Sequence, residues 1–148
     1  MILAFDLDDT LYEEITFVKS GLKSVSDYLY RKYLIPKKDS KNFFYQELLK
    51  DRNKILDKAL IKFNIYSKNE VKKCLSVYRS HNPKIQLYPQ VNYIFRKFGK
   101  ESIYIITDGN KLVQKNKNVQ SQFSLTIEQE TRSQLHAGLG ITQTIKVR

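Results

Sequence analysis

The chain has 148 residues, 41% of them hydrophobic, and a formal net charge of +11. This length suits one domain, or a small core with an inserted cap. The sequence contains no run of about 20 apolar residues, which excludes a membrane span, and it begins without a basic region followed by an apolar signal segment, so we expect a cytoplasmic protein. The single cysteine, Cys74, agrees with this expectation because it has no partner for a disulfide.

The most informative segment comes early, where apolar residues 2–5 lead into DLDDT at residues 6–10. Side chains alternate along a strand, so we expect Asp6 and Asp8 to project to the same side at the strand's end. Two carboxylates this close repel each other unless a cation or a shared proton neutralises them. With bound Mg²⁺, Asp6 can attack an electrophile while Asp8 carries a proton to the leaving group, which suits phosphoryl transfer. The alternative is a solvated acidic turn, which the preceding strand disfavours.

Residues between this segment and Pro83 show helical periodicity. Apolar residues recur near helical spacing in three stretches, 17–34, 44–63 and 71–78. The stretches are separated or ended by residues that break helices, namely Pro36, the segment Asn64 to Ser67, and Pro83. We therefore predict three or four amphipathic helices.

Two residues of the third helical stretch carry reactive side chains. Cys74 continues the apolar pattern, and we interpret it as a packing residue rather than a nucleophile. His81 follows at the end of the stretch beside Asn82, and we interpret it as a solvated histidine near the helix C-terminus.

One more helix and a strand are predicted before residue 107. Residues 91–98 carry apolar side chains at helical spacing, and Gly99 is suited to end that helix. The near-continuous apolar run at residues 102–106 is typical of a parallel strand buried on both faces. About 100 residues separate Asp6 from Thr107, more than a simple crossover between adjacent parallel strands needs, so we expect an inserted domain.

The predicted strand runs into TDGN at residues 107–110, a set of residue types that suits an anion pocket. Thr107 can donate its hydroxyl, Gly109 lets the backbone approach closely, and the amides opening a helix from about Asn110 can bind a phosphate oxygen. On its own this segment is equally explained as a helix start with an Asp cap and a tight turn.

FDLDDTLY at residues 5–12 resembles the first motif of the haloacid dehalogenase-like (HAD) superfamily. In that motif the first Asp is the nucleophile and the second the acid/base, which implies these roles for Asp6 and Asp8. HAD phosphatases carry the second Asp, so the resemblance implies phosphate esters rather than haloacids as substrates. It also implies that the carboxylate of Asp6 and the main-chain carbonyl of Asp8 hold Mg²⁺.

TDGN resembles the second HAD motif, usually TNG or SNG, with Asp108 as a departure. The resemblance implies that Thr107 binds the substrate phosphate and that Gly109 and Asn110 line the same pocket. The helices placed after the first motif resemble the cap with which many HAD phosphatases close over their substrate.

The resemblance implies an α/β fold, a HAD-like Rossmannoid parallel sheet with an inserted α-helical cap. The core is expected from residues 1–12 and 88–117, and the cap from residues 13–87. Residues 118–148 form an atypical tail. We expect the sheet to be incomplete, because the lysine and the aspartates of the third and fourth HAD motifs are not recognisable in the chain.

The composition changes after Lys117, since only Phe123 among the aromatic residues and only Lys146 among the lysines lie beyond it. A polar tail of this kind often indicates disorder, although residues 125–127 and 141–147 could still form short strands. We interpret the change as the mark of a frameshift, a truncation or a fusion. Without the strand that carries the missing aspartates, the first strand would be left with an unpaired edge.

The motifs together predict Mg²⁺-dependent hydrolysis of a small phosphomonoester through an aspartyl-phosphate intermediate on Asp6. The alternative is a truncated, inactive HAD fragment or pseudoenzyme that binds only phosphate or a protein partner. The net charge of +11 raises the further possibility of a polyanion. The lysines are spread along most predicted helices, as on a solvated face, and this pattern disfavours nucleic acid as a partner.

Overall fold

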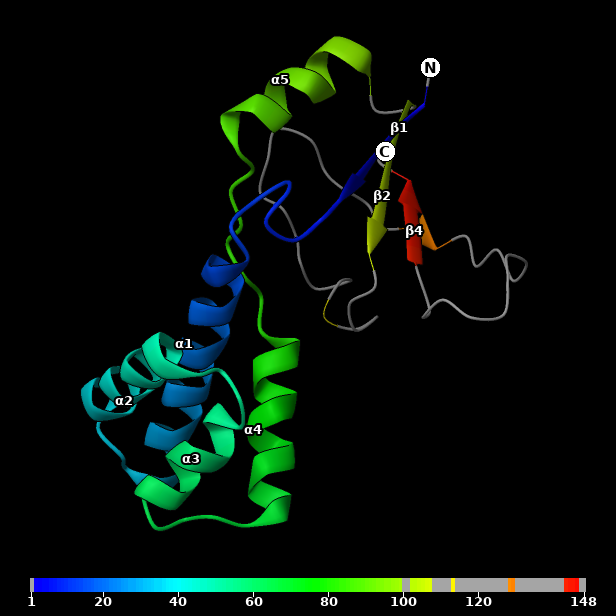
Figure 1. Cartoon of the computed structure of the whole chain (residues 1–148). Coiled ribbons are helices and arrows are strands. Elements are labelled where there is room, and N and C mark those ends of the chain that lie inside the picture. The colour runs from blue at the N-terminus through cyan, green and yellow to red at the C-terminus, as the bar shows by residue number, and fades with distance from the viewer. Residues whose placement is uncertain (1, 100–101, 108–112, 114–127, 130–142, 147–148) are drawn as a thin grey trace. The chain divides into compact units, whose positions relative to one another are not determined.

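The computed structural model describes residues 2–99, 102–107, 113, 128–129 and 143–146. The chain divides into two compact units, one made of Met1–Phe17 with Asn82–Arg148 and the other of Val18–His81 (Figure 1). The second unit therefore interrupts the first along the sequence. Within the described ranges no helix is long and apolar enough to cross a membrane.

The first unit is built on a small mixed sheet with the strand order β1-β2-β4-β3. β1 (Leu3–Asp6) and β2 (Ile103–Thr107) are parallel neighbours, as the sequence predicts. β4 (Gln143–Lys146) runs antiparallel to β2, and β3 (Glu128–Gln129) antiparallel to β4. The expected parallel sheet is therefore present in β1 and β2, and β4 and β3 extend it with antiparallel strands. The mostly polar sequence of β4 lacks the continuous apolar run of a buried parallel strand.

The two faces of the parallel pair differ in burial. Phe5 on β1 is the register partner of Ile105 on β2, which is buried. The ring of Phe5 lies 6.2 Å from that of Phe95 on α5 (Pro89–Phe98). Ala4 and Asp6 on the opposite face are exposed. Burial on both faces was expected of residues 102–106, and on β2 the structure shows Ile103 and Ile105 buried on one face and Tyr104 half-buried on the other.

β1 lies at the end of the sheet and has β2 as its strand neighbour in the described part of the chain. This agrees with the expected unpaired edge.

α5 begins with Pro89, whose missing backbone N–H would have no partner within the helix at this position. It ends at Gly99, whose φ of +73° suits glycine, and the amide of Gly99 donates to the carbonyl of Phe95.

The second unit is helical. Its elements are α1 (Glu14–Tyr33, with its first turn in the other unit), α2 (Lys37–Lys50), α3 (Ile55–Lys62) and α4 (Lys68–Ser80). Pro36 precedes α2, and the Ser67 hydroxyl accepts a hydrogen bond from the Glu70 amide at the start of α4. The prediction of three or four helices is confirmed. These helices lie within residues 13–87, whose role as a cap stays a prediction.

A buried carboxylate ties α4 to α1. Glu70, 4% exposed, accepts hydrogen bonds from the Tyr28 hydroxyl and, at 2.6 Å, from Lys32 Nζ. Burial alone would raise the pKa of Glu70, but the hydrogen bonds from Lys32 and Tyr28 outweigh it and hold the pKa below its usual value. A buried charge satisfied in this way orients the two helices against each other.

Candidate active site

Asp6 is the last residue of β1 and its side chain is exposed. Its register partner on the parallel strand is Ile106, so Thr107 ends β2 one position beyond the level of Asp6. Parallel strands end at the same edge of a sheet, which is where open α/β sheets bind ligands. The backbone therefore brings Asp6 and Thr107 to one edge, although they are about 100 residues apart in the sequence.

Asp8 is positioned by a turn and not by the strand. β1 ends at Asp6, and Leu7 is buried and accepts a 3.1 Å hydrogen bond from the Leu11 amide. Asp8 and Tyr12 then form an isolated parallel bridge. The expectation that Asp8 projects to the same side as Asp6 stays a prediction, since β1 ends at Asp6 and the turn sets the position of Asp8.

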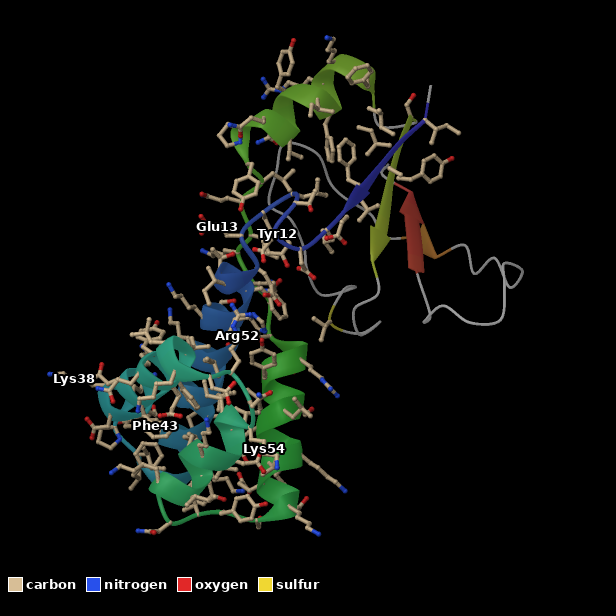
Figure 2. The ribbon with its side chains drawn as sticks, viewed as in Figure 1. Tyr12, Glu13, Lys38, Phe43, Arg52 and Lys54 are labelled. Carbon is tan, nitrogen blue, oxygen red and sulfur yellow. The ribbon has the colours of Figure 1, made fainter. Side chains whose placement is uncertain are left out.

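Tyr12 is the residue at this site that the sequence reasoning did not identify. Tyr12 lies in the segment between β1 and α1 (Figure 2). Its side chain is fully buried, and its hydroxyl donates a hydrogen bond to Asp8 Oδ1. The pKa of Tyr12 lies far above its usual value, mainly because of burial and then because of the hydrogen bond and charge of Asp8. The sequence feature that could have identified Tyr12 is its place directly after the apolar residue Leu11. A tyrosine that is buried there needs a partner for its hydroxyl.

Asp9, the third aspartate of the segment, has a structural role. Its φ of +56° places it in the left-handed region, which Asp tolerates better than most residues. Its Oδ1 accepts a 2.8 Å hydrogen bond from the amide of Glu14, the first residue of α1. Asp9 thereby satisfies one of the amides that have no partner within the helix.

The turn from Leu7 to Tyr12 is also held by a hydrogen bond from a residue outside it. The Tyr88 amide donates a 2.9 Å hydrogen bond to the Leu11 carbonyl, directly before α5 begins. The turn from Leu7 to Tyr12 is thus fixed within itself and also to the segment that leads into α5. A site carried by this turn has a rigid backbone beneath it.

The chemistry of Asp6 and Asp8 suits Mg²⁺, which prefers oxygen ligands and is usually bound through one or two carboxylates, several waters and substrate phosphates. Over residues 2–99 and the shorter described ranges, no group of three or more His, Cys, Asp and Glu side chains is placed to hold a metal ion. The described donor set therefore fits the partial shell of a magnesium ion and not a complete protein cage.

Much of the predicted phosphate pocket lies outside the described residues. This holds for the side chain of Thr107, for Gly109 and Asn110, and for the helix expected to begin near Asn110. The predicted roles of these three residues stay predictions. For Thr107 the structure describes only the backbone, which ends β2.

Two reactive side chains belong to the helical unit instead. His81 is buried, with Nε2 2.7 Å from Ser20 Oγ and Nδ1 2.6 Å from the Tyr78 carbonyl oxygen. Burial lowers its pKa, and the hydrogen bond to Tyr78 opposes the shift. The expectation of a solvated histidine is wrong, because the helix end packs against α1. Cys74 is buried as predicted, and burial raises the pKa of its thiol to about 11, which leaves it unreactive at neutral pH.

Neither the models of known protein families nor the curated proteins compared with this chain give a match. A relation to the HAD superfamily is therefore a proposal. It rests on the segment at residues 5–12, on the segment at 107–110, and on the parallel register that brings the two to one edge of the sheet.

Proposed function

We propose that this chain is a HAD-like hydrolase that cleaves small phosphomonoesters through an aspartyl-phosphate on Asp6. The observation that carries the proposal is the parallel register of β1 and β2, in which an exposed Asp6 ends one strand where Thr107 ends its neighbour. An exposed carboxylate at the carboxyl edge of a parallel pair is placed to meet a ligand there.

The reaction takes two steps. A carboxylate oxygen of Asp6 attacks phosphorus, the bond between phosphorus and the ester oxygen breaks, and Asp8 gives its proton to the leaving alkoxide. Asp8, now ionised, then takes a proton from water as the water oxygen attacks the phosphorus. The acyl-phosphate bond breaks, inorganic phosphate leaves, and Asp6 and the protonated Asp8 are restored.

Other residues of the edge have supporting roles in this proposal. The Asp6 carboxylate and the Asp8 main-chain carbonyl would hold Mg²⁺, which supplies positive charge that offsets the negative charge of the phosphoryl group. Thr107, Gly109 and Asn110 would bind the phosphate oxygens through a hydroxyl and backbone amides.

The helical unit is strongly basic. Val18–His81 contains 16 lysine and arginine residues against six aspartate and glutamate residues, so it carries most of the net charge of the chain. A positive surface attracts anions, and phosphorylated small molecules are among them.

One observation favours the second candidate, an inactive HAD fragment or pseudoenzyme that binds phosphate or a protein partner. The described residues supply two carboxylates at the site and no third acidic ligand, while β1 has a strand neighbour on one edge in the part that the structure describes. A weak magnesium shell and an incomplete sheet would leave phosphate binding without turnover.

Hydrolysis of p-nitrophenyl phosphate with Mg²⁺ and with EDTA separates the two candidates. The hydrolase predicts turnover that needs Mg²⁺ and that disappears in Asp6→Asn. Asp39→Asn, the same change on an exposed residue of α2, should retain the wild-type rate. Equal background rates in wild type and Asp6→Asn would favour the inactive fragment.

A further inference from the structure

We propose that Tyr12 is a positioning residue for the acid/base Asp8, holding one of its carboxylate oxygens in a fixed orientation through the turn after β1. This inference rests on the proposed function, because it assigns Tyr12 a part in that reaction. The contact that carries it is the hydrogen bond from the Tyr12 hydroxyl to Asp8 Oδ1.

The burial of Tyr12 makes this hydrogen bond a strong constraint. The side chain is 0% exposed, as is that of its neighbour Leu11. A buried hydroxyl without a partner costs free energy comparable to a lost hydrogen bond, so the Tyr12 hydroxyl is held to an acceptor. Its acceptor is Asp8, four residues earlier in the chain.

The backbone of the turn fixes the geometry of the pair. Asp8 and Tyr12 face each other in a parallel bridge, and the Leu11 amide closes the turn on the Leu7 carbonyl. The Tyr88 amide holds the Leu11 carbonyl from outside the turn. The Tyr12 ring therefore has little freedom to move, and its hydroxyl fixes the orientation of the Asp8 carboxylate.

Tyr12 also keeps its proton throughout the working pH range. Burial, the hydrogen bond to Asp8, and the charges of Asp8, Glu14 and Asp9 all raise the pKa of Tyr12. Its hydroxyl therefore remains a donor and does not serve as a base. Tyr12 acts through Asp8 and is not itself a catalytic residue.

This arrangement has one consequence for the reaction. Rotation of the Asp8 carboxyl group is restricted, so its proton is delivered along a fixed direction, and fixed geometry accounts for a large share of catalytic rate enhancement.

Tyr12→Phe tests the proposal because it removes the hydroxyl and keeps the ring. We expect kcat for phenyl phosphate, whose leaving group needs a proton, to fall by about 10-fold or more, with KM unchanged and a much smaller fall for p-nitrophenyl phosphate. Tyr93→Phe is the matched control, since Tyr93 is an exposed tyrosine of α5 in the same unit. A purely structural role would lower the fraction of active enzyme and therefore lower the rates for both esters alike.

The outcomes separate this proposal from the proposed function. Wild-type turnover that is lost in Asp6→Asn but unchanged for both esters in Tyr12→Phe would overturn the role of Tyr12 and leave the hydrolase intact. A wild type as inactive as Asp6→Asn would overturn both. If Tyr12→Phe fails to fold, incorporation of 3-fluorotyrosine at residue 12 keeps the ring and hydroxyl but makes the hydroxyl a stronger donor. We then expect a changed kcat for phenyl phosphate at unchanged KM, and an unchanged kcat would overturn the proposal.

Discussion

Asp6 and Ile106 are direct partners in the parallel register of β1 and β2, so the chain leaves both strands at one edge of the sheet. Exposed Asp6 stands at this edge, and the turn that holds Asp8 begins immediately after it. The proposed chemistry and the stability of this turn depend on different residues of the same short segment, so substitutions can separate them.

Asp9 should contribute to stability and not to the chemical step. We expect Asp9→Ala to lower the free energy of unfolding by about 1–2 kcal/mol, because the Glu14 amide loses its acceptor and alanine tolerates the left-handed backbone poorly. Asp9→Asn keeps an acceptor and tolerates this backbone, so its unfolding midpoint in urea should stay close to wild type. A wild-type midpoint for Asp9→Ala would show that the cap has no energetic role.

Gly21 is required where α1 approaches the end of α4. A Cβ at this position would lie 2.6 Å from ring atoms of Tyr78 and 3.1 Å from a carbon of the His81 ring. Alanine normally favours a helix over glycine, but here we expect Gly21→Ala to destabilise the protein by about 1–3 kcal/mol. Ser24→Ala, one turn later on α1, is the control and should change stability by less than about 0.5 kcal/mol. Thermal unfolding of both variants measures the difference, and stabilisation by Gly21→Ala would contradict the close approach.

His81 should make stability depend on pH. Its pKa is lowered by burial, so below the usual value of 6.5 the unfolded chain takes up a proton that the folded protein resists. The contribution of His81 is therefore fully present above pH 6.5 and is lost as the pH falls toward its lowered pKa. Urea unfolding measured between pH 8 and pH 5 should show this loss in wild type and a smaller one in His81→Gln. Identical pH dependence in the two proteins would exclude His81 as the source.

Glu70 should stabilise the helical unit through its charge. We expect Glu70→Gln to lower the free energy of unfolding by about 1–3 kcal/mol, because a neutral amide cannot replace the buried carboxylate that accepts from Lys32 and Tyr28. Asp57→Asn is the matched control, because this partly exposed residue of α3 loses the same charge. Chemical denaturation compares the two, and equal midpoints would show that burial of Glu70 adds nothing.

The elements that were predicted correctly have local causes in the sequence. Helical periodicity with breaks at Pro36 and before Ser67 places the helices of the second unit, and Gly99 marks the end of α5. The parallel strand that ends at Thr107 follows from its apolar run. The direction of β4 was not predicted, because its polar run of four residues disfavours a buried parallel strand but does not specify the neighbour with which it pairs.

The site was predicted only as far as local pattern allows. Asp6 lies where the strand pattern placed it, whereas Asp8 lies beyond the end of the strand, after buried Leu7, where the strand pattern alone does not fix its position. The contact of Tyr12 with Asp8 depends on the shape of that turn. The burial of His81 depends on Ser20, 61 residues away, a contact that no local pattern indicates.

The most direct measurement is chemical identification of a phosphoryl group on Asp6. The protein is mixed with p-nitrophenyl phosphate and Mg²⁺, quenched in acid and reduced with borohydride, which converts an aspartyl-phosphate to homoserine, and the peptide that contains residues 5–12 is sequenced by mass spectrometry. The proposed function predicts homoserine at residue 6, dependent on Mg²⁺ and absent in Asp6→Asn. Turnover of the ester without homoserine at residue 6 would contradict it.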